Sequence, residues 1–205
     1  MNKIQRTLIE TQFNGTELKG WLPTSFWYMI DSKLRTKVKL KNYLETQVAN
    51  ASARTKRIAR SLVGKRSDDG IINILKWVKS NFKYKRDYDN YGKVELWADI
   101  ETMMDNKADD CDGMNTVIYV LARLQGIPDD ALYACIGNVW LTNKSGGHFW
   151  LVFWSPRHDK LVTIDSTYYP NLNDTLNRPP FKITPKRYQS VWYFFNSRDT
   201  LRVKS

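Results

Sequence analysis

The chain has 205 residues, 42% of them hydrophobic, and carries a formal net charge of +11. This length predicts one domain with a real core, with room for an extension. No apolar run reaches the roughly 18 residues of a membrane-spanning helix, and two cysteines exclude a disulfide scaffold.

The first ten residues lack the apolar stretch of a secretory signal peptide. Together with the low cysteine count, this predicts a cytoplasmic protein, or one associated with a virus particle that assembles in a reducing compartment. Residues 1–30 are expected to pack on the main domain through a short strand or helix that carries Trp21, Phe26, Trp27 and Tyr28.

The basic charge is concentrated in residues 31–66, which hold eleven Lys and Arg against Asp31 and Glu45, a net charge of +9. Residues 31–63 lack Pro and Gly, so we expect helix there. The segment either binds an acidic or anionic partner or is a solvated basic face. Nucleic acid is disfavoured because only Tyr43 interleaves with the basic residues.

The stretch Gly64–Gly70 is rich in turn residues and marks the predicted boundary. We therefore expect a basic, mostly helical extension over residues 1–66 and a main domain over 67–205. In the main domain, apolar periodicity predicts a helix over Ile71–Phe82, a polar loop over Lys83–Lys93 and a short helix after Trp97.

The next helix follows Asp109-Asp110-Cys111-Asp112-Gly113. Apolar residues then recur with helical spacing, and Gly126 and Pro128 end the pattern. Cys111 is therefore expected in the first turn, where unpaired N–H groups and the helix dipole favour a thiolate. The alternative for a lone cysteine is an inert core residue, which is our expectation for Cys135 within a predicted strand.

Strands are expected near residues 131–140, 148–154, 160–165 and 190–195. His148 opens the second of them, and Asp165 closes the third. If these two strands form a hairpin that turns near Arg157–Lys160, His148 and Asp165 lie at the same end. A carboxylate there can hold an imidazole in one tautomer. The residues thus suggest a catalytic set of Cys111, His148 and Asp165, whereas His158 is expected to be a solvated turn residue.

This ordered set resembles the transglutaminase-like superfamily with its papain-type fold. The resemblance covers about residues 68–170 and looks nearest to bacterial and phage transglutaminase-like cysteine proteinases. Leu124-Gln125-Gly126-Ile127-Pro128 is similar to the end of their cysteine helix, and Trp97 and Glu101 look like residues that precede their cysteine. The implied fold is α+β: a cysteine-bearing helix packed on an antiparallel sheet, with the helical extension added.

The implied function is thiol-dependent acyl transfer, with a peptide or protein as substrate. Water as acyl acceptor gives a cysteine peptidase, which the resemblance favours, and an amine gives a cross-linking transglutaminase. A non-catalytic structural module, such as a phage virion protein, is the competing class. Trp97 either shapes the pocket and oxyanion site or is a core residue.

Asp109, Asp110 and Asp112 crowd Cys111 with negative charge, which opposes a thiolate. The chemistry requires no cofactor, but clustered carboxylates suit Ca²⁺. The resemblance implies calcium beside the cysteine, with Asp110 and Asp112 as ligands. The sequence departs from the relatives at Gly113, where they carry another acid. The alternative is that these acids cap the helix and pair with basic residues.

Overall fold

A computed structural model describes residues 37–141, 144–168, 188–198 and 200–202. The elements expected within residues 1–36 lie outside the described residues. In chain order the elements are α3 (Lys37–Ala49), α4 (Ala53–Ser61), α5 (Ser67–Asn81), β1 (Lys83–Tyr84), α6 (Asp87–Tyr91), α7 (Ile100–Asn106), β2 (Ala108–Asp109), α8 (Cys111–Leu124), the 3-10 helix η2 (Asp129–Ala131), β3 (Leu132–Leu141), β4 (Lys144–Ser155), β5 (Lys160–Ile164), β6 (Tyr188–Phe195) and β7 (Thr200–Arg202).

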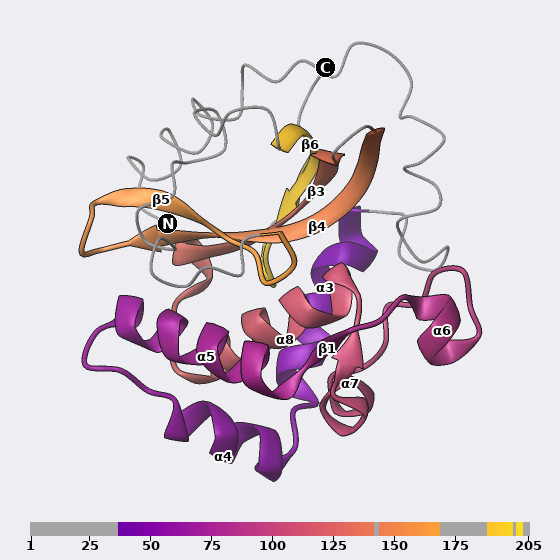
Figure 1. The fold of residues 1–205 in the computed structure, drawn as a ribbon. Coiled ribbons are helices and arrows are strands. Elements are labelled where there is room, and N and C mark those ends of the chain that lie inside the picture. Colours follow the sequence, from indigo (N-terminus) through magenta and orange to yellow (C-terminus); the bar gives the residue numbers. More distant parts are fainter. Residues whose placement is uncertain (1–36, 142–143, 169–187, 199, 203–205) are drawn as a thin grey trace.

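The molecule has two layers, with the helices on one face of an antiparallel sheet (Figure 1). The five strands of this sheet run in the order β5-β4-β3-β6-β7, and β1 and β2 form a separate pair. The expected α+β fold, with the cysteine helix packed on an antiparallel sheet, is therefore confirmed.

Helix α8 lies at the centre of the helical layer, where it contacts α3, α4, α5, α7 and β4. Residues 112–122 are all buried, so this helix is enclosed on every side and not only along the apolar stripe seen in the sequence. Successive side chains of a strand point to opposite faces of the sheet. Ile136 and Phe149 belong to the core around α8, whereas Cys135 and Trp150 belong to a second apolar cluster on the opposite face.

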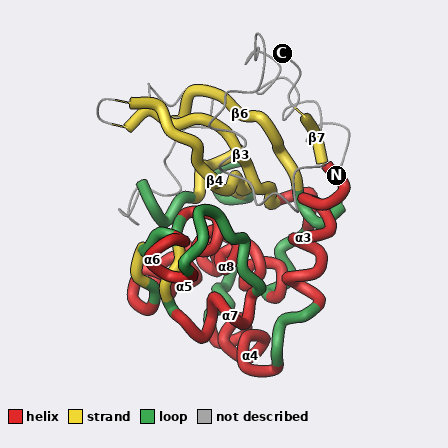
Figure 2. The backbone as a smooth tube through the Cα atoms, turned by 90° about the vertical axis from the view of Figure 1, so that its right-hand side faces the viewer, coloured by secondary structure: helices red, strands yellow, loops and turns green. Residues whose placement is uncertain are grey.

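From Lys37 onward, the segment predicted to be helical over residues 31–63 forms two helices, α3 and α4. The second helix begins after Ser52, because the Ser52 side chain accepts the N–H of Thr55 at 3.2 Å and so caps the N-terminus of α4. Leu40 and Leu44 of α3 are fully buried in the core that surrounds α8. Figure 2 shows α3 rising beside α8 toward β7, which it contacts. The described helices of the basic segment thus pack on the main body of the protein.

Within the described residues, none of the helices combines the length and apolar character that crossing a bilayer requires.

Candidate active site

Cys111 is the first residue of α8. Asp110 is the N-cap, and its carboxylate accepts the N–H of Asp112 at 3.3 Å. The backbone before the cysteine is held by β2, which pairs in parallel with β1. In that pair, the N–H of Lys85 donates to the carbonyl of Asp109 at 2.9 Å. The start of α8 is therefore held by the Asp110 cap and by the strand pair that precedes it.

Asn115 joins the first turn of α8 to the sheet. Its amide donates to the carbonyl of Cys111 and to the carbonyl of Phe149, both at 2.9 Å. Its side-chain oxygen accepts the N–H of Ser166 at 3.4 Å. One buried side chain thus connects the cysteine turn, the strand of His148 and the segment that follows Asp165.

His148 and Asp165 form a buried pair, with Nε2 and Oδ2 2.8 Å apart. The hairpin of β4 and β5, in which Ser155 faces Lys160, brings them together. The other carboxylate oxygen of Asp165 accepts the N–H of Thr167 at 2.8 Å. The ring of Tyr168 packs on the imidazole, with centroids 4.5 Å apart. These contacts fix the orientation of the imidazole.

The Cys111 sulfur is placed against β4. Burial raises the pKa of its thiol well above the usual range, and the charge of Asp110 raises it further, while the backbone N–H of Phe149 lowers it. Phe149 directly follows His148, so the thiol lies beside the strand that carries the imidazole.

Trp97 lies in the core between Tyr43 and Phe149, at centroid distances of 5.2 Å and 5.3 Å. Its indole N–H donates to Glu95 at 3.0 Å. Glu101 accepts the N–H of Ser52 at 3.0 Å and the hydroxyl of Thr55 at 2.7 Å, so it anchors α4.

An acidic cluster surrounds the start of α8. Ligand atoms of Asp110, Cys111 and Asp112 lie within 4.8 Å of one another, and so do those of Asp87, Glu95 and Asp112. Asp112 is buried, and its Oδ2 has no hydrogen-bond partner among the described residues. Burial, followed by the charge of Asp110, raises the pKa of Asp112 well above the ordinary value. Neutralisation of this carboxylate therefore requires a proton or a cation.

Asp109 explains the glycine at position 113. The Asp109 carboxylate is fully buried and accepts the hydroxyl of Tyr91 at 2.8 Å and the N–H of Asp110 at 2.9 Å. Burial raises its pKa to about 7. A Cβ at Gly113 would overlap this side chain, so a glycine at this position makes room for Asp109.

Asp87 and Glu95 were not singled out by the sequence analysis. Asp87 comes from Lys83–Lys93, the segment expected to be a polar loop, which contains β1 and the short helix α6, and Glu95 lies just after that segment. Asp87 is buried and accepts the N–H of Leu96. Acids in and just after a tyrosine-rich segment were the available signal, but only the pairing of β1 with β2 shows where they lie.

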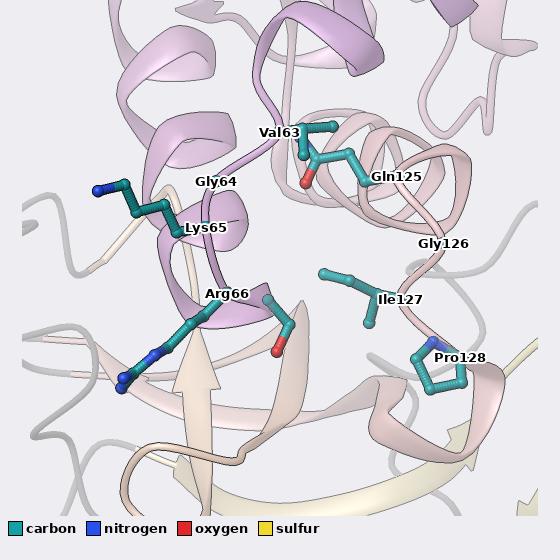
Figure 3. A pocket seen from close by; sticks show the side chains of 9 residues that line it. Val63, Gly64, Lys65, Arg66, Gln125, Gly126, Ile127 and Pro128 are labelled. Carbon is teal, nitrogen blue, oxygen red and sulfur yellow. The ribbon is translucent and has the colours of Figure 1, made fainter.

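A cavity of about 190 Å³ lies at the opposite end of α8, between residues 63–67 and 125–128. The side chains of Lys65 and Arg66 point away from it (Figure 3). None of the predicted site residues lines this cavity. His158 is exposed in the β4–β5 turn, and Cys135 is buried in the sheet.

The model of the transglutaminase-like domain family matches residues 53–169, more than half of the sequence. The chain belongs to this family. The match begins within the segment expected to be an N-terminal extension, at the first residue of α4.

Solved structures show the same fold. Calcium-bound LapG of Legionella pneumophila aligns with a TM-score of 0.56 at 15% identity, covering 80% of this chain and 88% of that one. LapG treated with EGTA aligns with a TM-score of 0.56 at 16% identity, covering 80% and 86%. No curated protein matches the chain.

Proposed function

We propose that the chain is a thiol-dependent acyl-transfer enzyme, a cysteine peptidase of transglutaminase-like type with Cys111, His148 and Asp165 as its catalytic residues. The observation that carries the proposal is the buried contact of 2.8 Å between His148 and Asp165, next to the strand residue whose N–H approaches the Cys111 sulfur. A carboxylate in this position fixes the tautomer and stabilises the imidazolium.

Because Nε2 faces Asp165, the mechanism assigns Nδ1 of His148 to proton exchange with Cys111. Nδ1 takes the thiol proton as the sulfur forms a bond to the substrate carbonyl carbon. His148 then gives the proton to the leaving amine as the C–N bond breaks, which leaves a thioester. Water attacks the thioester, its proton passes through His148 to the sulfur, and the acid is released. The backbone N–H of Cys111 is the assigned donor to the oxyanion.

We propose further that Asp110 and Asp112, with Asp87 and Glu95, hold Ca²⁺. The support is the buried Asp112 oxygen that lacks a hydrogen bond and its closeness to two other carboxylates. Hard carboxylate oxygens are the preferred calcium ligands. The calcium-bound form of LapG is consistent with such a site but shows only its own. A bound cation would neutralise the negative charge around the thiol.

Labelling with iodoacetamide at mildly acidic pH tests the nucleophile. We expect fast modification of Cys111 that is abolished in Cys111→Ala and unchanged in Cys135→Ala. Peptidase activity should follow the same pattern, with a loss of on the order of 10⁴-fold or more in Cys111→Ala. Equal, slow labelling of both cysteines would instead favour a non-catalytic structural module.

The acyl acceptor is tested by adding a fluorescent primary amine to the protein with dimethylated casein. Hydrolysis without incorporation of the amine supports the peptidase. Covalent incorporation that depends on Cys111 would identify a cross-linking transglutaminase.

Calcium is tested by thermal melting in EGTA, Mg²⁺ and Ca²⁺. At a calcium concentration of about 100 times Kd, binding adds about 2.7 kcal/mol to the free energy of unfolding. Asp112→Asn should abolish this calcium-dependent gain. A melting temperature that calcium leaves unchanged in the unaltered protein would contradict the site.

A further inference from the structure

A cavity of about 370 Å³ lies beside the proposed catalytic residues. Its lining comes from three parts of the fold: β1 and the residue before α6, the first turn of α8, and the turn after β5. The lining residues are Tyr84, Arg86, Met114, Ser166, Thr167 and Tyr168.

The lining is continuous with the site. Met114 lies one helical turn after Cys111, and Ser166 directly follows Asp165. Tyr168 contributes the ring that packs on His148. A substrate whose carbonyl carbon reaches the Cys111 sulfur therefore places a neighbouring residue in this cavity.

Arg86 is the charged residue of the lining, and among the described residues it forms no ion pair. Arg86 lines the same cavity as Met114, which lies in the first turn of α8 with Cys111. Burial raises the pKa of Tyr84, the charge of Cys111 raises it further, and Arg86 lowers it. A guanidinium at the rim of a concave site binds carboxylates in a bidentate manner.

Two hydroxyl groups of the lining are also unpaired within the described part of the chain. The oxygens of Ser166 and Thr167 are buried and make no hydrogen bond to a described residue. Buried hydroxyls are usually satisfied, so two such groups in one wall indicate an occupant that supplies the missing partner. After a change of χ1, each can donate to a substrate oxygen. Tyr84, Met114 and Tyr168 provide apolar contact for the aliphatic part of a side chain.

We propose that this cavity is a substrate subsite and that Arg86 makes it selective for a residue that carries a carboxylate. The substrate class is thus a peptide with an acidic residue next to the bond that is cut. This inference rests on the proposed function, and Arg86 acts in it as a specificity-determining residue.

Iodoacetate and iodoacetamide test the charge preference, because they alkylate the same sulfur and differ in carrying or lacking a carboxylate. The rate of Cys111 labelling is measured with each reagent, and the ratio of the two rates is compared between proteins. A change in the pKa of the thiol alters the labelling rates with both reagents by the same factor, so it cancels in the ratio of the rates. In Arg86→Gln we expect the ratio of iodoacetate to iodoacetamide to fall about 3-fold to 10-fold.

The matched control is Arg57→Gln, which removes an exposed arginine of α4 that likewise forms no ion pair among the described residues. Its ratio should equal that of the unaltered protein. A ratio that Arg86→Gln leaves unchanged, or that Arg57→Gln lowers equally, overturns the subsite.

A mixture of short capped peptides, with cleavage products identified by mass spectrometry, extends the test to substrates. We expect Asp and Glu to be enriched at one position near the cut, and this enrichment to be lost in Arg86→Gln. Cleavage without such enrichment overturns the subsite and leaves the peptidase standing. A lower labelling ratio without cleavage of any peptide supports the subsite and contradicts the peptidase.

Discussion

The two ends of α8 differ in how their polar groups are satisfied. At the C-terminal end, the N–H of Gln125 donates to Leu121 at 3.1 Å, and the N–H of Ile127 donates to Ala122 at 3.1 Å. Arg123 pairs with Asp129 at 2.8 Å. The carbonyls of Leu121 and Ala122 in the last turn are thus paired, as a structural helix end requires.

At the N-terminal end, carboxylates crowd together, and the buried Asp112 has an oxygen without a hydrogen bond. The same helix thus ends in a stable cap and begins in an arrangement that is unfavourable without a cation or proton. Such unfavourable groups cluster where proteins bind or react. Substitutions at the C-terminal end should therefore alter stability, and those at the N-terminal end should alter activity.

Removal of residues 1–66 should have the largest effect. It deletes α3 and α4, which contact α8, and takes away the Ala59 carbonyl that accepts the Gln125 amide at 3.1 Å. We expect the truncated protein to show no cooperative transition in thermal melting, because buried Leu40 and Leu44 are lost with it. A cooperative melt near that of the full chain would instead identify the segment as a separable docking arm.

Asp165→Asn tests the catalytic end. The asparagine should keep the fold but fix the His148 tautomer less well, so we expect the rate to fall about 10³-fold to 10⁴-fold. Peptidase assays and circular dichroism measure the two effects. A variant that keeps full activity would remove Asp165 from the proposed mechanism.

Arg123→Ala tests the structural end. It removes one of the two arginines that pair with Asp129, which keeps Arg198 at 3.4 Å and the hydroxyls of Tyr119 and Ser197, so we expect the free energy of unfolding to fall by about 2 kcal/mol. Denaturant unfolding measures this loss. Labelling of Cys111 in the folded variant should be unchanged, and a change there would show that the two ends are coupled.

Glu101→Gln should have the smallest effect and a defined pH dependence. Burial raises the pKa of Glu101, but hydrogen bonds from Ser52 and Thr55 outweigh it, so the pKa is lowered. A carboxyl group with a lowered pKa stabilises the fold above its unfolded pKa, and this contribution is lost as the pH falls through the folded value. We expect the variant to lose about 1 kcal/mol at neutral pH.

The difference in the free energy of unfolding between Glu101→Gln and the unaltered protein should shrink below about pH 4. A difference that stays constant with pH would mean that the charge of Glu101 does not contribute.

The sequence predicted the elements that local patterns encode. Apolar spacing after Cys111 gave α8, and the turn near Arg157 gave the hairpin that brings His148 to Asp165. The break at Ser52 was missed because propensity alone does not show a cap. The approach of Asp87 to Asp112 was missed because it depends on a parallel pairing between segments far apart in the chain.

The pairing of β1 with β2 has a thermodynamic consequence. It joins the backbone of Tyr84, in the wall of the proposed subsite, to that of Asp109, which precedes the proposed calcium ligands. Where one ligand alters the free energy of the other's binding through such a unit, the coupling is reciprocal. If a peptide that fills the subsite tightens this pairing, calcium affinity and peptide affinity should rise by the same factor, so that each ligand reports the presence of the other.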